Sequence, residues 1–364
     1  MGITESFFNF QAQKNLWRRA ARILKLGVIE GFYGRSWSRN RRLQLLPWFA
    51  ALNLDAYLYA PKNDAWLRRR WRDRWPRAYL SNLQELGTAA RSAGIEFHVG
   101  LSPFKLYESY DGAARVALRG AVRRLEDLGV GGVAILFDDM PGGVDSLAAR
   151  QAEILIDVHD WLDMPLLRFC PTYYSDDPTL DRVFGDRPEN YLVELVSSLP
   201  PDLIPFWTGP AVCSDSVPAS HLETLRRTIG RPLALWDNYP VNDSRTRSEH
   251  LYVAPLAARA PSDALESHWC NAMNQGALSL PALSSLVRLH GGESRDARRV
   301  LAEAGVTEAL VRACLPLAER ERESLDHREK ASLLSLAPDG SAAAGELGDW
   351  VEGLYRFDPA CLTD

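Results

Sequence analysis

The sequence has no long apolar run, which excludes the usual signals for membrane insertion. None of its 364 residues lies in a stretch that approaches the ~20 apolar residues of a membrane span. Residues 1–24 mix charged and apolar side chains, without the continuous apolar core of a signal peptide. The sequence therefore predicts no membrane partner, and a cytoplasmic protein is the default expectation.

Cysteine and histidine are also scarce. The five cysteines are odd in number, far apart and without CxxC spacing, so we expect reduced thiols. The seven histidines form no ligand pair at helical spacing. The sequence predicts neither a metal site nor a cofactor.

An excess of positive charge is missing too. The net charge is -5 and the pI is near 5.9, which argues against a protein that binds nucleic acid or anionic membranes. Residues 68–77 are rich in arginine, but this stretch is local, and a solvated loop is its plainest interpretation. A hydrophobic fraction of 46% with 24% charged residues is ordinary for a globular protein, and 11 tryptophans are many.

The most informative feature is the pair Asp138 and Asp139, which follows the apolar run at residues 133–137. Such a run is typical of a strand that is buried on both faces of a parallel sheet. Two neighbouring carboxylates resist ionising together, so one tends to keep its proton. One acid beside one anion suits catalysis, although capping or turn aspartates explain the pair alone about as well.

Strand-like and helix-like segments alternate along residues 26–271, which is the pattern of a parallel α/β fold. The expected strands are 26–34, 54–61, 95–103, 130–139, 166–174, 203–209 and 232–238, with a weaker eighth within 266–271. The expected helices begin near Ser38 and cover 79–93, 112–128, 146–161, 190–198 and 219–229. Eight such units in roughly 255 residues predict a TIM (β/α)8 barrel.

The remaining residues indicate the domain organisation. From about residue 278 the strand signals stop and apolar residues fall at helical spacing, which predicts a small C-terminal helical region. We expect a turn at 338–341 and a short final helix within 345–364. The predicted division is an extension at 1–24, a barrel at 25–277 and the helical region at 278–364.

Polar residues gather at the carboxyl ends of the expected strands. They lie at 30–34, 61–62, 102–103, 138–139, 172–174, 207–209 and 236–238. Active sites of TIM barrels lie on that face. Polar loops explain one such cluster well but seven poorly.

These segments resemble glycoside hydrolase family 84, the β-N-acetylglucosaminidases that include protein O-GlcNAcase. The resemblance spans residues 27 to about 275, in family order. It rests on residues 27–34 with Trp37, 57–64, Arg68, 71–73, 75–76, 136–139, 170–172 with Tyr174, 207–210, 236–238, 242–243 and 271–273. The departures are Ser36, Asn63 and Ala272, together with Tyr173 and the loop 175–177, which borders the expected acetamido side of the pocket.

The resemblance implies a role for each matching residue. Asp138 would orient the 2-acetamido N–H, and Asp139 would be the general acid and base. Gly31 through its backbone, Lys62, Asp243 and Asn271 would bind sugar hydroxyls. Further expected site residues are Tyr174 at the acetamido group, Cys170 and Trp236 around its pocket, and Asn238 in support of the acid pair.

The adjacency of the two aspartates bears on the mechanism. Ordinary retaining glycosidases place two carboxyl groups ~5 Å apart across the sugar, which neighbours at one strand end cannot easily do. In substrate-assisted hydrolysis the acetamido oxygen is the nucleophile and an oxazoline is the intermediate, which removes the difficulty. We expect the charge of Asp138 to raise the pKa of Asp139, and the pH dependence to be bell-shaped.

The leading hypothesis is a retaining exo-β-N-acetylglucosaminidase, resembling O-GlcNAcase, that acts on a β-GlcNAc-bearing glycoside or glycoprotein. Two alternatives stay open at this point. One is a hyaluronidase-like endo-β-N-acetylhexosaminidase, which an open cleft would favour. The other is a non-catalytic barrel that binds GlcNAc or glycoprotein. The natural substrate, the oligomeric state and the role of the helical region are not readable from the sequence.

Overall fold

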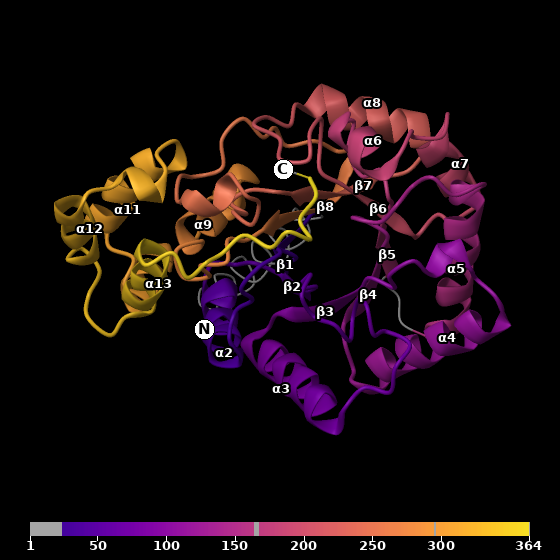
Figure 1. Cartoon of the computed structure of the whole chain (residues 1–364), viewed down its shortest axis with the longest axis horizontal. Helices are drawn as coiled ribbons and strands as arrows, with labels where there is room; N and C mark the ends of the chain where they lie inside the picture. The colour runs from indigo at the N-terminus through magenta and orange to yellow at the C-terminus, as the bar shows by residue number, and fades with distance from the viewer. Residues whose placement is uncertain (1–23, 164–166, 295, 364) are drawn as a thin grey trace, which may run out of the picture.

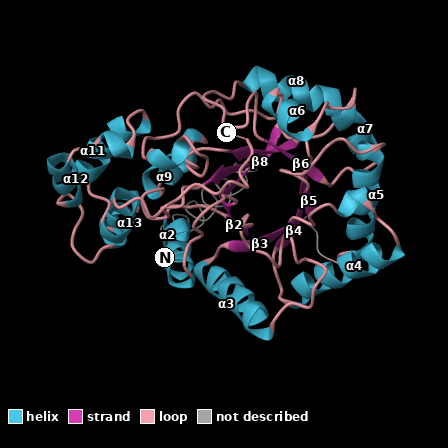
Figure 2. Ribbon diagram, in the orientation of Figure 1, coloured by secondary structure: helices cyan, strands magenta, loops and turns pink. Residues whose placement is uncertain are grey.

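Eight parallel strands close into a barrel at the centre of the molecule (Figures 1 and 2). The computed structural model describes residues 24–163, 167–294 and 296–363. The strands are β1 (Lys25–Glu30), β2 (Ala56–Tyr59), β3 (Glu96–Leu101), β4 (Gly132–Leu136), β5 (Leu167–Cys170), β6 (Ile204–Trp207), β7 (Leu233–Asp237) and β8 (Leu265–Asn271). The predicted TIM barrel is confirmed.

The weakest of the predicted strands, β8, is the one that closes the barrel. It pairs with β7 on one side and with β1 on the other. Its signal is weak because polar residues interrupt the apolar pattern. These residues are bonded inside the barrel: Ser267 Oγ accepts from Trp269 Nε1 at 2.8 Å, and His268 Nε2 lies 3.1 Å from Asp237 Oδ2.

A ring of helices surrounds the barrel (Figure 2). They are α2 (Arg39–Ala51), α3 (Arg77–Ala93), α4 (Gly112–Asp127), α5 (Leu147–Trp161), α6 (Thr179–Phe184), α7 (Tyr191–Ser197), α8 (Ala219–Ile229) and α9 (Leu280–Leu289). As expected, Ser38 caps α2, its hydroxyl accepting from Arg41 N at 3.1 Å. The short α6 was not predicted, because six residues are too few to show a helical period.

The helical region continues with four α-helices and short 3-10 turns. The helices are α10 (Ala297–Ala304), α11 (Glu308–Cys314), α12 (His327–Leu334) and α13 (Ala342–Val351). The 3-10 turns of the chain are η1 (Leu106–Glu108), η2 (Arg247–Glu249), η3 (Leu315–Ala318) and η4 (Arg322–Ser324). Because α9 packs against β1, it belongs to the ring by its contacts. The predicted boundary at 277 stays a prediction.

The final helix differs from the expectation of a helix within 345–364. It begins at Ala342, where Ser341 Oγ accepts from Ala344 N at 3.1 Å, and it ends at Val351. Gly353, with a φ of +71°, lies in the left-handed region that terminates helices. Residues 352–363 then leave the helical region and run across the barrel as the yellow trace in Figure 1.

Helix α13 is attached to the barrel through Glu346. Its carboxylate accepts from the backbone N–H groups of Ala277 at 2.8 Å and Leu278 at 3.1 Å, and lies 2.8 Å from Arg41 Nε. Burial raises the pKa of Glu346 to about 7, although Arg41 and the two N–H groups oppose the rise. This contact fixes the point from which residues 352–363 depart.

A buried ion pair at the end of β1 holds α2 against the barrel. The Glu30 side chain is 0% exposed, and Arg42 donates to it from Nε at 2.8 Å and from Nη2 at 2.7 Å. Tyr57 on β2 also donates to Glu30. Glu30 thus ties two strands to a helix directly before Gly31.

We predict that Glu30→Gln lowers the free energy of unfolding by about 3 kcal/mol, because it leaves the Arg42 charge buried without its counter-charge. Urea unfolding measures the change. Glu85→Gln is the matched control, since Glu85 pairs with Arg39 at the surface with side chains 42% and 49% exposed. The control should lose no more than about 1 kcal/mol. Equal losses in the two variants would contradict the assignment.

Candidate active site

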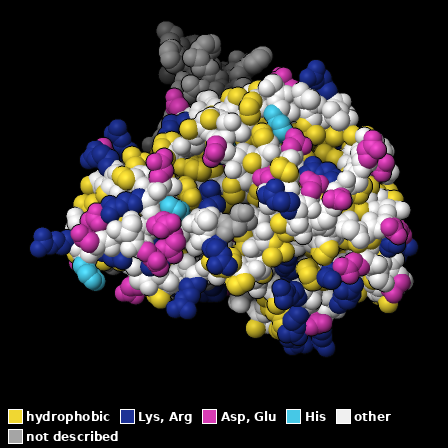
Figure 3. Space-filling view, turned by 45° about the horizontal axis from the view of Figure 1, so that its top comes forward, with side chains coloured by type: hydrophobic (Ala, Val, Ile, Leu, Met, Phe, Trp, Pro, Cys, Tyr) yellow, Lys and Arg dark blue, Asp and Glu magenta, His cyan; other side chains and the backbone are white. Residues whose placement is uncertain are grey.

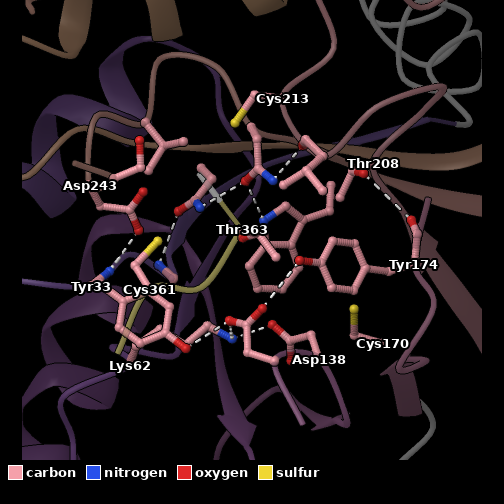
Figure 4. Close-up of a pocket in the computed structure, with 18 residues that line it drawn as sticks. Tyr33, Lys62, Asp138, Cys170, Tyr174, Thr208, Cys213, Asp243, Cys361 and Thr363 are labelled. Atoms are coloured by element: carbon pink, nitrogen blue, oxygen red, sulfur yellow. Dashed lines mark hydrogen bonds and ion pairs between the residues drawn. The ribbon is translucent and has the colours of Figure 1, made fainter. Parts of the chain in front are cut away.

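A cavity of about 510 Å³ lies at the carboxyl ends of the strands (Figure 4). Every residue predicted from the sequence lines it: Gly31, Lys62, Asp138, Asp139, Cys170, Tyr174, Trp236, Asn238, Asp243 and Asn271. The other lining residues are Tyr33, Thr208, Val212, Cys213, Val241, Ser244, Cys361 and Thr363. The barrel therefore brings the predicted set together, although placement alone does not test the role of each residue.

The acid pair lies just beyond the end of β4, with Phe137 between the strand and Asp138. Asp138 and Asp139 are 6% and 8% exposed. Asp139 has a φ of +56°, in the left-handed region that residues with a Cβ rarely adopt. Arg68 Nη2 donates to the Asp139 carbonyl at 3.1 Å, and Arg68 Nη1 donates to Ser102 Oγ at 3.3 Å. The buried Arg68 thereby holds the strained backbone that separates the directions of the two carboxylates.

Lys62 lies between the two carboxylates. Its ammonium donates to Asp138 Oδ2 and lies 3.5 Å from Asp139 Oδ2, with its side chain 4% exposed. The two carboxylates raise the pKa of Lys62, because their charges outweigh the burial that lowers it. The cation stabilises a site that would otherwise place two like charges side by side.

Asp138 keeps one oxygen uncommitted. Its Oδ1 is buried and has no hydrogen-bond partner among the residues that the structure describes. Buried polar atoms are rarely left unpaired, because each costs about 1–3 kcal/mol. Asp138, which lines the cavity, thus keeps an unpaired acceptor oxygen next to Asp139.

Asp139 is surrounded by donors. Tyr33 Oη donates to its Oδ2 at 2.9 Å, and Tyr174 Oη donates to its Oδ1 at 3.2 Å. Burial raises the pKa of Asp139, but the charges of Lys62 and Arg68 and the two phenols outweigh burial and hold the pKa below its usual range. The expectation that Asp138 raises it is wrong for the site in this arrangement, because the nearby cations dominate.

The phenols and the thiol at this site stay protonated. Burial, followed by the charge of Asp139, raises the pKa of Tyr33 and of Tyr174 well above 10. Burial, followed by the charge of Asp138, raises the pKa of Cys170 well above its usual value. Cys170 is therefore a packed thiol in the pocket wall and not an activated nucleophile.

A hydrogen-bonded chain shapes the opposite wall. Asn271 Oδ1 accepts from Gly31 N at 3.1 Å, and Asn271 Nδ2 donates to Asn238 Oδ1 at 3.0 Å. Asn238 Oδ1 also accepts from Trp236 Nε1 at 3.0 Å. Only glycine fits at Gly31, because a Cβ there would lie 2.5 Å from Trp236 Cζ2. These bonds place Asn238 behind Trp236 and Asn271, while its expected support of the acid pair stays a prediction.

Asp243 lies across the cavity in the loop after β7. Its Oδ2 accepts from Tyr33 N at 2.7 Å. Burial, together with the charge of Asp139, raises the pKa of Asp243 to about 6. It is therefore a carboxylate at neutral pH and becomes protonated in mild acid.

Sequence reasoning left Tyr33, Arg68, Cys361 and Thr363 out of the site. Tyr33 and Arg68 stand within the segments that carry the family resemblance, so their positions were a usable signal. Cys361 and Thr363 offered none, since they lie about 90 residues beyond the last strand. Only the course of residues 352–363 over the barrel brings them into the cavity.

One group in the described part of the chain has the side chains of a metal site: Asp237, His268 and Cys270. The Asp237 carboxylate already accepts from Arg259 Nε and Nη2, both at 2.9 Å. Burial raises the pKa of Cys270 well above its usual value, which keeps the thiol protonated. A guanidinium on the carboxylate repels a cation, so this group links β7 and β8 and does not suit a metal.

Two further features concern the charge of the surface and the length of the helices. On the face shown in Figure 3, basic and acidic side chains are interspersed over most of the view. None of the helices among the described residues combines the length and the apolar character needed to cross a membrane.

Comparisons with known proteins place the chain. A family model for beta-N-acetylglucosaminidase matches residues 26–307. The protein O-GlcNAcases of Mus musculus and Rattus norvegicus are each 31% identical over 250 residues, which is 66% of this chain and 27% of those proteins. The chain thus spans about a quarter of the length of these curated relatives.

A solved structure agrees. A mutant of the Thermobaculum terrenum O-GlcNAc hydrolase has a TM-score of 0.74 and 26% identity, covering 91% of this chain and 82% of that one. The closed barrel, the acid pair at the end of β4 and the family match over residues 26–307 lead to one conclusion. The chain belongs to the β-N-acetylglucosaminidase family of glycoside hydrolases, family 84.

Proposed function

We propose that this chain is a retaining exo-β-N-acetylglucosaminidase that works by substrate-assisted catalysis. The observation that carries the proposal is the buried, unpartnered Oδ1 of Asp138 in the cavity beside Asp139. An acceptor in that position suits the N–H of a 2-acetamido group. Because the two aspartates are consecutive, they do not straddle a sugar ring as nucleophile and acid.

The first chemical step forms an oxazoline. Asp138 accepts a hydrogen bond from the acetamido N–H, which keeps its proton through both steps, and the charge of Asp138 offsets the positive charge of the oxazolinium form. The acetamido oxygen attacks C1 while the bond from C1 to the glycosidic oxygen breaks, and Asp139 gives its proton to that oxygen. In the second step Asp139 takes a proton from water, which attacks C1, opens the oxazoline and leaves the sugar with retained configuration.

Asp139 has to carry a proton before the first step, whereas its surroundings here favour the carboxylate. A sugar hydroxyl that binds to Lys62 competes with the aspartates for that ammonium. The sugar also displaces water from the cavity. Both effects raise the pKa of Asp139 toward the value that a general acid needs. Lys62 thus couples occupation of the pocket to protonation of the acid.

The far wall of the cavity favours exo over endo action. Asp243 and Asn271, together with the Gly31 carbonyl, would bind the hydroxyls of a terminal GlcNAc. Trp236 is 4% exposed and closes the wall behind Asn271. A closed wall at this position supports exo action over the hyaluronidase-like alternative.

The substrate class is a terminal β-GlcNAc on a glycoside or a glycoprotein. The relatives' names support protein-linked O-GlcNAc, although the chain spans about a quarter of the mammalian proteins. A cytoplasmic location and the expected lack of nucleic-acid, membrane and cofactor partners stay predictions.

We predict that Asp139→Asn lowers kcat/KM for substrates with poor leaving groups by about 10²–10⁴-fold, the usual contribution of a general acid. Activated aryl β-GlcNAc substrates, whose leaving groups need little protonation, should lose far less. Initial rates on an alkyl and a nitrophenyl glycoside measure the difference. Asp243→Asn is the control, because a residue that binds the sugar affects both substrates alike. Equal losses on both substrates in Asp139→Asn would reject Asp139 as the acid.

Substrates with an altered acetamido group test whether the acetamido oxygen is the nucleophile. Each fluorine placed on the N-acetyl methyl of an aryl β-GlcNAc withdraws electrons from the acetamido oxygen, so we expect kcat/KM to fall steeply along the mono-, di- and trifluoro series. The same steady-state assay on each substrate measures the trend. A flat series would point to a nucleophile from the protein. Binding of a thiazoline mimic of the oxazoline without any turnover would support the non-catalytic barrel.

We predict an acid limb in kcat/KM with an apparent pKa near 6, the value for Asp243. Above that pH Asp243 is a carboxylate and accepts from sugar hydroxyls, whereas below it the protonated acid is a poorer acceptor, so KM rises as pH falls. In Asp243→Asn the limb should disappear and the maximum should be lower. A limb that persists unchanged in this variant would belong to another group.

A further inference from the structure

The last described residues lie over the active-site cavity. Beyond α13, residues 352–363 form an extended segment without helix or strand, here called the strap. In Figure 1 the strap runs from α13 to the open end of the barrel. Figure 4 shows Cys361 and Thr363 among the residues of the acid pair's pocket.

Two aromatic residues attach the strap to the rim of the barrel. The guanidinium of Arg35 lies 5.0 Å from the centre of the Tyr355 ring, and that of Arg245 lies 4.6 Å from the centre of the Phe357 ring. Both contacts are cation–π interactions at partly exposed positions, where such contacts are individually weak.

A turn then directs the strap into the cavity. Asp358 Oδ1 accepts from Ala360 N, and the Asp358 carbonyl accepts from Cys361 N, both at 2.9 Å. The Cys361 residue is 8% exposed and lines the cavity. Thr363 lines the same cavity as Tyr174, and Tyr174 donates to Asp139. The strap therefore reaches the cavity that holds the proposed acid.

A second cavity continues outward from the strap. It has a volume of about 560 Å³, and Thr363 lines both cavities, as do Val212, Cys213 and Ser244. Its outer lining is polar and carries both signs of charge, with Asp177, Thr179, Thr246 and Arg247. The two cavities adjoin at these shared residues, and Thr363 of the strap lies where they meet.

We propose that the two adjoining cavities take an extended polypeptide and that the strap is their resident, intramolecular occupant, which a GlcNAc-bearing polypeptide displaces. The proposal rests on the proposed function and adds the regulation and the polypeptide path of that site. The strap is itself an extended polypeptide that places a threonine side chain at the acid pair's pocket. It thus excludes the sugar and its aglycone together.

Part of the attachment of the strap lies at the surface. Its leucines do not anchor it, since Leu354 and Leu362 are 45% and 53% exposed. Two surface cation–π contacts and one turn hold it, together with the packing of Tyr355 against the core and the buried Cys361. On this proposal the segment exchanges between a bound and a released state, and the apparent affinity for substrate is the intrinsic affinity multiplied by the released fraction.

The test compares the full chain with a chain that ends at Gly353, which retains α13. We expect the shortened chain to bind a GlcNAc-thiazoline at least about tenfold more tightly by calorimetry, as for a strap that is closed nine-tenths of the time. KM for an aryl β-GlcNAc should fall by the same factor, with kcat little changed. Unchanged affinity would overturn the proposal.

Point variants keep the test informative if the shortened chain folds poorly. Phe357→Ala removes the ring from Arg245 and should shift affinity in the same direction, whereas Leu362→Ala, at an exposed position of the same strap, should change nothing. Equal effects of the two would count against an anchored strap.

A synthetic peptide of residues 354–363, added to the shortened chain, shows whether the strap competes with the substrate or instead completes the pocket. Competitive inhibition against the aryl glycoside is the expected result. Restoration of lost activity by the peptide would mean that the strap completes the pocket, and would overturn the proposal. If no form turns over the aryl glycoside while a labelled peptide is still displaced by the thiazoline, the proposed catalytic function fails and the strap proposal stands.

Discussion

The ammonium of Lys62 between Asp138 and Asp139 is the interaction on which this site depends. Two carboxylates on consecutive buried residues cannot both stay ionised without a counter-charge. Lys62 supplies it from the end of β2, and Arg68 adds a second cation through the backbone of Asp139. The same arrangement explains why the Asp139 pKa is low here, and why a group that competes for Lys62 would release Asp139 to act as an acid.

The closed barrel makes this arrangement possible. Lys62 and the acid pair lie just beyond β2 and β4, and Trp236 and Asn271 lie at the ends of β7 and β8. They meet because parallel strands in a closed barrel end at one rim. Residues at the same rim that do not line the cavity hold the barrel together instead. Glu30 binds Arg42 and Tyr57, and Asp237 binds Arg259 and His268. The carboxyl ends of the strands thus carry both the residues of the cavity and the ion pairs that stabilise the barrel.

The helical region reaches the cavity through the strap that follows it, and not through its helices. Glu346 fixes α13 to the backbone at Ala277 and Leu278, and the strap leaves from the end of that helix toward the cavity. On the proposal above, the region places an intramolecular competitor of the substrate at the cavity that holds the acid pair.

The sequence alone predicted the barrel, because buried parallel strands leave continuous apolar runs. Through the family resemblance, its motifs also identified ten of the residues that line the pocket. It did not determine the pKa of Asp139, since the nearness of Lys62, Tyr33 and Arg68 follows from barrel closure and from a left-handed backbone at Asp139. Nor did it reveal the strap, whose contacts join residues far apart in the sequence, as Arg35 and Tyr355 show. Periodicity reports local structure, and only the tertiary fold decides which distant side chains share one enclosed space.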